Sequence, residues 1–186
     1  MIITISGRPG SGKSVVATQV AEALGIARAS AGDFMREMAK ERGLSILELS
    51  RVAEESDLID REIDERTVRL AAAADDLVID ARLGWHFVPD SFKVFLEVRP
   101  EVAARRVFEA ARNAEHENVD LERTRRAIES RTVSEQERYL EYYGLDYTDH
   151  DQYDLVVDTS ALTIGQVVAR IVEEARSESG KRGSIR

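Results

Sequence analysis

Residues 2–14, IITISGRPGSGKS, decide the fold, because they join a short apolar strand to a glycine-rich turn and then to a helix. The turn has the spacing Gly7-x-x-x-x-Gly12-Lys13-Ser14, which in this strand-to-helix context is typical of a phosphate-binding P-loop. Glycines let backbone N–H groups surround phosphate oxygens, and the helix N-terminus adds partial positive charge. We therefore expect Lys13 to reach the β- and γ-phosphates of a nucleoside triphosphate and the Ser14 hydroxyl to ligate Mg²⁺.

Composition indicates a compact, single-domain protein. The 186 residues are 43% hydrophobic, and no apolar run approaches the roughly 18 residues of a membrane-spanning helix. The chain shows no signal-peptide pattern and no cysteine, which predicts a cytoplasmic protein without disulfides or thiolate metal sites. Its net charge of −9 argues against DNA or RNA as the main partner.

Short apolar strands alternate with helices along the chain. Strands are predicted at residues 2–6, 27–30, 76–80, 93–98 and 154–158. Helices are predicted at residues 14–24, 31–42, 60–74, 100–113 and 163–176, with another beginning at a capping box at Ser45 and a long charged one ending near Tyr143. Residues 177–186 are expected to be a flexible tail after a single domain of residues 1–176. The alternation predicts an α/β/α three-layer fold of the P-loop NTPase type with a five-stranded parallel sheet, in which ligands bind beyond the C-terminal ends of the strands.

Two charged clusters follow predicted strands and should therefore lie beside the P-loop. After the second strand, Gly32-Asp33 is expected to cap a helix whose first turn carries Arg36, and an arginine there can pair with a second phosphate group. After the third strand, Asp80 is a candidate to hold a Mg²⁺-bound water and Arg82 to bind an acceptor phosphate. The alternatives are a solvated helix residue at Arg36 and a simple strand-end cap at Asp80.

Arg131 and Arg138 form a third basic feature, in the long charged helix. Seven residues correspond to two helical turns, so both guanidinium groups lie on one face. Phosphoryl transfer requires positive charge over the oxygens of the migrating group, which such arginines would supply. The alternative is an ordinary solvated helix face. Trp85, close to Arg82, is a further candidate for the wall of an acceptor pocket, whereas the three histidines lack the spacing of metal ligands.

The segments ITISGRPGSGKS, SAGDFMREMA, IDARLGW, RTVSEQERY and DLVVDTS together resemble the nucleoside monophosphate kinases. Among these the chain most resembles the archaeal-type cytidylate kinases, which transfer the γ-phosphoryl group of ATP to CMP. The order and spacing of the segments agree over about residues 1–173. The resemblance implies a five-stranded parallel sheet, a helical segment at residues 43–66 that binds the nucleoside monophosphate, and a small lid at about residues 110–124.

The resemblance also implies a role for each candidate residue. The residues implied to bind ATP are Gly7, Arg8, Pro9, Gly10, Ser11, Gly12, Lys13, Ser14 and Val15. Asp33, Arg36 and Arg82 would bind the acceptor monophosphate. Lys13, Arg131 and Arg138 would be catalytic, with Mg²⁺ held at Ser14 and Asp80. Arg106 and Arg112, which flank the implied lid, are secondary candidates for the same catalytic role.

Residues on the acceptor side depart from the family pattern. The run Asp80-Ala81-Arg82-Leu83-Gly84-Trp85 is one residue shorter than the corresponding run of related sequences, and the HFVPDS that follows also differs. These departures leave a kinase of AMP, UMP or a small metabolite as an alternative. Because a P-loop alone does not show where the γ-phosphoryl group goes, a P-loop protein that hydrolyses a nucleotide as a switch is a second alternative, and an RNA-associated ATPase, which the acidic net charge disfavours, is a third. The expected partners are ATP and a nucleoside monophosphate, CMP or dCMP, with no nucleic acid and no membrane, and the protein is expected to be a monomer.

Overall fold

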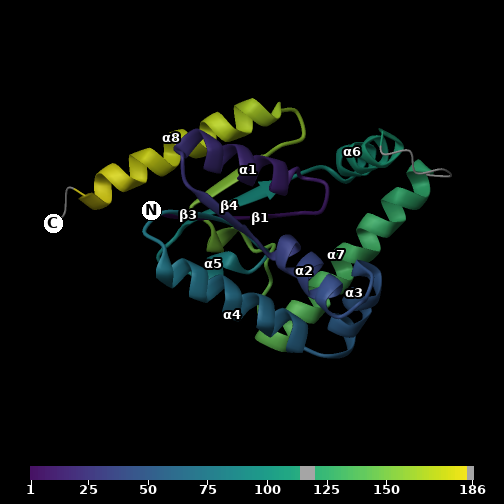
Figure 1. Cartoon of the computed structure of the whole chain (residues 1–186). Coiled ribbons are helices and arrows are strands. Elements are labelled where there is room, and N and C mark those ends of the chain that lie inside the picture. Colours follow the sequence, from purple (N-terminus) through teal and green to yellow (C-terminus); the bar gives the residue numbers. More distant parts are fainter. Residues whose placement is uncertain (114–119, 184–186) are drawn as a thin grey trace.

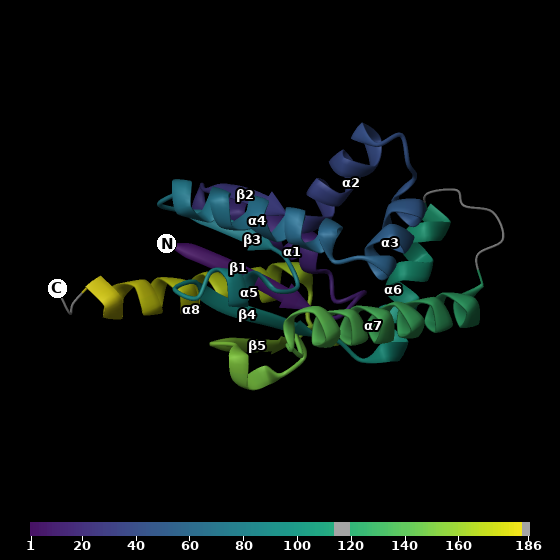
Figure 2. The ribbon, with the colours of Figure 1, turned by 90° about the horizontal axis from the view of Figure 1, so that it is seen from below.

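A five-stranded parallel sheet forms the centre of the computed structural model, which describes residues 1–113 and 120–183. Its strands are β1 (Ile2–Gly7), β2 (Ala27–Ser30), β3 (Leu77–Asp80), β4 (Phe92–Glu97) and β5 (Leu155–Asp158). Their order across the sheet is β2-β3-β1-β4-β5, which Figure 2 shows from below. The predicted α/β fold with a five-stranded parallel sheet is confirmed.

Helices cover both faces of this sheet and so complete three layers. They are α1 (Lys13–Leu24), α2 (Ala31–Glu41), α3 (Ile46–Glu55), α4 (Leu58–Ala73), α5 (Gly84–Phe87), α6 (Pro100–Asn113), α7 (Leu121–Tyr143) and α8 (Ile164–Gly183). α1 and α8 pack together on one face, and α4 and α5 lie on the other (Figure 1). α6 and α7 pack against each other and extend beyond the sheet (Figure 2).

Each face of the sheet has its own apolar core, because the strands are buried on both sides. One core joins α1 and α8 to the strands and contains Val20 and Ile171, neither of which is exposed. The other joins α2, α3 and α4 to β3 and contains Phe34 and Ile59. Helices anchored in this way hold the strand ends in fixed positions.

The register of the sheet brings the ends of three strands together. Asp80, the last residue of β3, lies opposite Ile5 of β1 and opposite Ser30, the last residue of β2. The turn after β1, the helix after β2 and the segment after β3 therefore begin side by side. This is the edge at which a parallel sheet binds its ligands.

Two elements differ from the sequence-based prediction. α5 was not predicted, because a four-residue helix has too short a periodic pattern to be recognised. α8 continues to Gly183, so residues 177–183 are helical rather than a flexible tail; Glu, Arg and Lys in this stretch favour a helix strongly enough to tolerate Gly180. Residues 184–186 lie outside the described residues.

The segments that the family resemblance implied are described in part. Residues 43–66 contain α3 and the first half of α4, and the capping box at Ser45 is confirmed, because Glu48 N donates to Ser45 Oγ and Ser45 N donates to Glu48 Oε2. Of the implied lid, the structure describes only the end of α6 and the start of α7, and residues 114–119 lie outside the described residues. Within residues 1–113 and 120–183, no helix combines the length and apolarity needed to cross a bilayer.

Candidate active site

The P-loop runs from the end of β1 to the start of α1, where the sequence predicts it. Its path depends on glycines, since a Cβ at Gly7 would lie 2.6 Å from the carbonyl oxygen of Leu96. Gly10 has a φ of +79°, and a Cβ there would lie 2.7 Å from the Cβ of Ala103. The loop therefore packs directly on β4 and α6, and its backbone is free to turn around an anion.

Lys13 and Asp80 form a buried ion pair at the end of the P-loop. The Asp80 side chain is 1% exposed, and its Oδ2 also accepts a hydrogen bond of 3.2 Å from Ser30 Oγ. Burial alone would raise the pKa of Asp80, but the positive charge of Lys13 and hydrogen bonds from Ser14 and Ser30 outweigh it and lower the pKa. Asp80 is therefore an ionised carboxylate beside the Ser14 hydroxyl.

Ser14 and Asp80 fit a Mg²⁺ site of the kind found in P-loop enzymes. Mg²⁺ prefers oxygen ligands and is usually held by one or two protein groups together with substrate phosphates and water. Ser14 and Asp80 supply such oxygen atoms, whereas no cluster of three or more His, Cys, Asp or Glu side chains among the described residues could hold a metal by itself. Bound nucleotide would have to complete the coordination.

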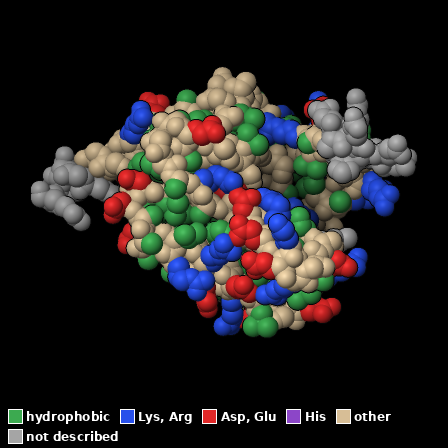
Figure 3. Space-filling model, viewed as in Figure 1, with side chains coloured by type: hydrophobic (Ala, Val, Ile, Leu, Met, Phe, Trp, Pro, Cys, Tyr) green, Lys and Arg blue, Asp and Glu red, His purple; other side chains and the backbone are tan. Residues whose placement is uncertain are grey.

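A single cleft of about 1390 Å³ opens over the P-loop. This volume exceeds the roughly 300–1,000 Å³ of a pocket for one small ligand. All the P-loop residues implied to bind ATP line the cleft except Gly7 and Ser11. In Figure 3, acidic and basic side chains alternate over the middle of the face, and neither sign forms a broad field there.

Arg36 lines this cleft from α2, with its side chain 58% exposed. Asp33 does not cap the helix as predicted, because the N-cap is Ser30 and Asp33 lies within the first turn. Asp33 instead contacts Arg36 and Arg28 at 2.5 and 2.6 Å, and these contacts lower its pKa. Asp33 is not among the residues that line the cleft, so it acts there only through its ion pair with Arg36.

Arg82 lies on the floor of the cleft, between the P-loop and α7. Its Nη1 donates to the carbonyl oxygen of Gly7 at 2.5 Å, and its Nε donates to Glu135 Oε2 at 2.8 Å. Burial alone would lower the pKa of Arg82, but Glu135 raises it, so the guanidinium stays charged. Arg82 therefore links the phosphate-binding turn directly to the long helix.

Arg131 and Arg138 both line the cleft from α7, as predicted from their spacing. Arg131 is 66% exposed and its Nε donates to Glu135 Oε1 at 2.9 Å. Arg138 is 15% exposed and forms an ion pair of 2.8 Å with Asp60 Oδ2, at an angle unfavourable for a hydrogen bond. The structure thus brings Lys13, Arg36, Arg82, Arg131 and Arg138 into one cleft.

Two buried carboxylates of this cleft hold its arginines, a role that the sequence predicted for neither of them. Glu135 forms ion pairs with Arg82 and Arg131. Asp60, at the start of α4, forms an ion pair with Arg138. Burial alone would raise the pKa of Glu135, but the two arginines outweigh it and lower the pKa to about 2. The i,i+4 spacing of Arg131 and Glu135 was a usable signal for their contact, whereas the contacts made across the fold left no local pattern.

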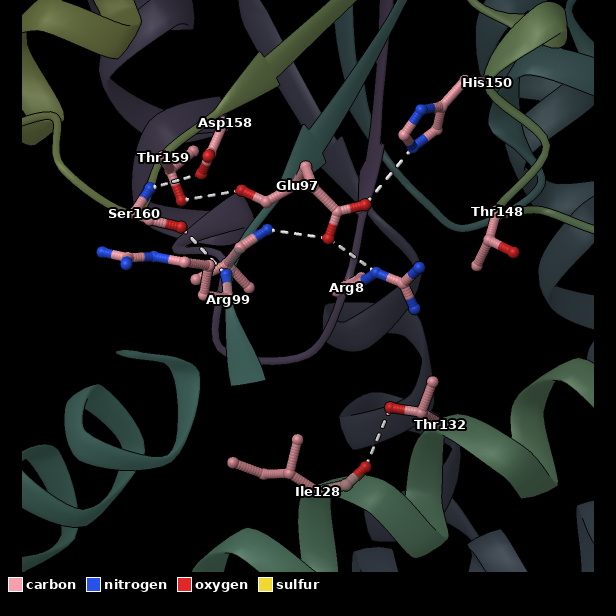
Figure 4. A network of polar contacts seen from close by, with 12 residues as sticks. Arg8, Glu97, Arg99, Ile128, Thr132, Thr148, His150, Asp158, Thr159 and Ser160 are labelled. Atoms are coloured by element: carbon pink, nitrogen blue, oxygen red, sulfur yellow. Dashed lines mark hydrogen bonds and ion pairs between the residues drawn. The ribbon is translucent and has the colours of Figure 1, made fainter. Parts of the chain in front are cut away.

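A polar network supports the P-loop from the β4 and β5 side (Figure 4). Arg8 Nε donates to Glu97 Oε1 at 2.6 Å, and the same carboxylate accepts from Val98 N and lies 3.3 Å from His150 Nε2. Arg106 donates to the hydroxyl and the carbonyl oxygen of Thr159, and it is not among the residues that line the cleft. Arg106 therefore has a structural contact, and the Arg112 side chain lies outside the described part of the chain.

Trp85 does not form a wall of the cleft. It is 7% exposed and packs edge-on against Tyr153 and His86, with ring centroids 5.8 and 5.6 Å apart. The possibility that Trp85 contacts an acceptor is therefore not supported. Its packing instead fixes α5, directly after Arg82.

Comparison with known proteins agrees with this geometry. Residues 2–161 match the cytidylate kinase-like family. The cytidylate kinase of Methanothermobacter thermautotrophicus is 44% identical over 160 residues, which cover 86% of this chain and 96% of the relative. The cytidylate kinase of Natronomonas pharaonis is 41% identical over 177 residues, which cover 94% of this chain and 88% of the relative.

Solved structures share the fold at lower identity. An uncharacterized protein from Eubacterium ventriosum superposes with a TM-score of 0.69 at 19% identity, over 95% of this chain and 99% of that chain. A shikimate kinase from Acinetobacter baumannii superposes with a TM-score of 0.59 at 16% identity, over 95% of this chain and 93% of that chain. The extent and identity of the sequence matches show that this chain belongs to the cytidylate kinase-like family.

Proposed function

We propose that this chain is a nucleoside monophosphate kinase that transfers the γ-phosphoryl group of ATP to CMP or dCMP, giving ADP and the corresponding diphosphate. One observation carries the proposal: a P-loop and a separate set of arginines, from the segments after β2 and β3, line the same cleft. The volume of about 1390 Å³ suits two nucleotides better than one. The names of the related cytidylate kinases favour CMP as the acceptor.

The donor and the acceptor occupy opposite sides of the cleft. ATP binds with its phosphates in the P-loop, where backbone N–H groups and the α1 N-terminus face them. The acceptor phosphate binds to Arg36 and Arg82, and Asp33 holds Arg36 in place through their ion pair. The segment of residues 43–66, which contains α3 and the start of α4, contacts the nucleoside.

The chemistry consists of positioning and charge stabilisation. The acceptor phosphate is already ionised, so no strong general base is required. Lys13, Arg131 and Arg138 place positive charge around the migrating group as the bond to the leaving ADP breaks. Ser14 and Asp80 would hold Mg²⁺, which would supply positive charge to the donor phosphates.

The Lys13–Asp80 ion pair prepares both residues for this reaction. Before ATP binds, each charge compensates the other in a buried position. When the triphosphate enters, Lys13 exchanges Asp80 for phosphate oxygens, and the carboxylate of Asp80 would then be available, with Ser14, to hold Mg²⁺. All of these residues come from one chain, so the monomer is proposed as the active form.

An acceptor panel tests the proposal. Purified protein is incubated with ATP, Mg²⁺ and one of CMP, dCMP, UMP or AMP, and both ADP and the new diphosphate are quantified. The expected result is stoichiometric ADP and CDP, with CMP or dCMP giving the highest kcat/KM. If UMP or AMP were the best acceptor, the protein would still be a nucleoside monophosphate kinase, but its acceptor would not be CMP or dCMP. If ADP formed equally fast with and without a monophosphate, the protein would instead be a nucleotide-hydrolysing switch.

A further inference from the structure

Three arginines that line the cleft, Arg8, Arg82 and Arg131, each contact a carboxylate through Nε. Arg8 Nε lies 2.6 Å from Glu97, Arg82 Nε lies 2.8 Å from Glu135 Oε2, and Arg131 Nε lies 2.9 Å from Glu135 Oε1. The guanidinium group carries its single ε N–H on one edge and its two terminal NH₂ groups on the others. A carboxylate held at the ε edge therefore leaves the terminal NH₂ groups to other partners, and in Arg82 one of them, Nη1, donates to the carbonyl oxygen of Gly7 at 2.5 Å.

The direction of these contacts determines where the remaining donors point. Figure 4 shows Arg8 with its ε nitrogen toward Glu97 and its two terminal nitrogens turned away from that carboxylate. Arg138 also approaches its partner, Asp60, with Nε at 2.8 Å, but the angle of that contact is unfavourable for a hydrogen bond. By contrast, Arg36 at the rim of the cleft uses a terminal nitrogen to contact Asp33. Contact through Nε is thus shared by Arg8, Arg82 and Arg131, which come from the P-loop, the segment after β3 and α7.

Glu135 is the carboxylate that holds two of these arginines at once. Arg131 comes from the same helix, one turn earlier, whereas Arg82 comes from the segment after β3. The Glu135 side chain is 10% exposed, and each of its oxygens accepts from a different Nε. Because each oxygen accepts from an arginine and an ionised carboxylate repels phosphate, Glu135 acts through the arginines rather than on the phosphates of a bound nucleotide.

We propose that Glu135 is a positioning residue for phosphoryl transfer: it fixes the ε edges of Arg82 and Arg131, so that Nη2 of Arg82 and the terminal nitrogens of Arg131 converge on the phosphates between the P-loop and α7, while Nη1 of Arg82 stays on the carbonyl oxygen of Gly7. The inference rests on the proposed function, which assigns those two arginines to phosphates. Bidentate contacts of arginine with phosphate depend on the plane of the guanidinium, so a fixed plane is a catalytic advantage.

A negative charge at this position has a second consequence. Glu135 weakens the attraction of the two arginines for the phosphates of bound substrates, because it partly neutralises them. Removing the charge should therefore leave substrate binding unchanged or tighter while the orientation of the arginines is lost. Loss of kcat without a rise in KM identifies an interaction needed only in the transition state.

The test compares Glu135→Gln with Glu129→Gln, a control on the same helix whose exposed carboxylate pairs with Arg125 outside the cleft. For Glu135→Gln, kcat with CMP is expected to fall about 10- to 100-fold, as for a small displacement of a reacting group, with KM for CMP and ATP equal to or below that of wild type. The control is expected to keep wild-type kcat. A folded Glu135→Gln protein with wild-type kcat, or with a raised KM and unchanged kcat, would overturn the inference.

Two further variants separate positioning from stability. Glu135→Asp keeps the negative charge, but its side chain is one methylene too short to reach both arginines. The ion pairs are therefore loosened rather than lost, and kcat is expected to fall. Wild-type kcat in this variant would overturn the inference even where Glu135→Gln does not fold. In the Arg131→Gln background, Glu135→Gln is expected to cost a smaller factor in kcat than in wild type, and an equal factor would contradict action through Arg131. Failure of the wild-type protein to phosphorylate any monophosphate would instead reject the proposed function.

Discussion

Replacement of Lys13 by alanine tests how the structure links catalysis to stability. The sequence assigns Lys13 a role only in phosphate binding, but the structure also makes it the partner of a carboxylate that is 1% exposed. Removing one member of a buried ion pair typically costs about 3–5 kcal/mol, because the remaining charge is left uncompensated. Asp80 would keep Ser30 at 3.2 Å and Arg28 at 3.7 Å, so we expect the lower end, about 3 kcal/mol.

A loss of this size is measurable in a domain of this length. It corresponds to a decrease in Tm of about 10 °C, together with a decrease in kcat of about 100-fold or more. The double variant Lys13→Ala/Asp80→Asn removes the buried charge, so it should recover most of the Tm and none of the activity. Thermal unfolding and ADP release with CMP provide the two readouts. A Lys13→Ala protein as stable as wild type, or a double variant no more stable than the single one, would refute this reasoning.

Three other predictions follow from contacts in and around the cleft. Gly10→Ala should weaken ATP binding and lower Tm, because the new methyl group would meet Ala103 at 2.7 Å at a φ of +79°; wild-type ATP affinity by titration would be inconsistent with the packed P-loop. Arg36→Gln should raise KM for CMP about 10-fold or more while KM for ATP stays unchanged, and an equal rise for both substrates would show that Arg36 does not belong to the acceptor side. Burial raises the pKa of Asp64 to about 7, so its protonated form is favoured in the folded state and stability is lost as pH rises from about 4 through 7. Asp64→Asn should therefore increase Tm at pH 8 and change it little near pH 4, and the same increase at both pH values would contradict the titration of Asp64.

Much of the fold could be predicted from local pattern. The short apolar runs at residues 2–6 and 76–80 have the composition of strands buried on both faces, and Gly25 marks the end of α1 with a φ of +67°. α5 could not be predicted, because four residues are too few to show a helical period; in the fold, its Trp85 packs edge-on against Tyr153. The extension of α8 to Gly183 was missed because serine and glycine were weighted as helix-ending residues.

Some residues of the candidate site could be predicted from the sequence and others could not. The P-loop and the arginines that follow β2 and β3 were predictable, since their position at strand ends places them at the ligand-binding edge of a parallel sheet. The carboxylates that hold the arginines were harder to predict. The contacts of Glu135 with Arg82 and of Asp60 with Arg138 form only when α7 packs across the cleft, and only the Arg131–Glu135 pair has a local i,i+4 spacing. A charged helix read without its neighbours looks solvated, and only the packed structure shows which of its carboxylates are buried.

The central claim is that two nucleotides bind end to end in one cleft. The most direct measurement is calorimetric titration with a bisubstrate analogue in which adenosine and cytidine are joined through their 5′ positions by a chain of five phosphates. Binding end to end in one cleft predicts one analogue per chain, with an affinity at least 100-fold above that of ATP or CMP alone, because the second contact becomes intramolecular. It also predicts that Lys13→Ala and Arg36→Gln each reduce that affinity. Two analogues per chain, or an affinity no greater than that of ATP, would contradict it.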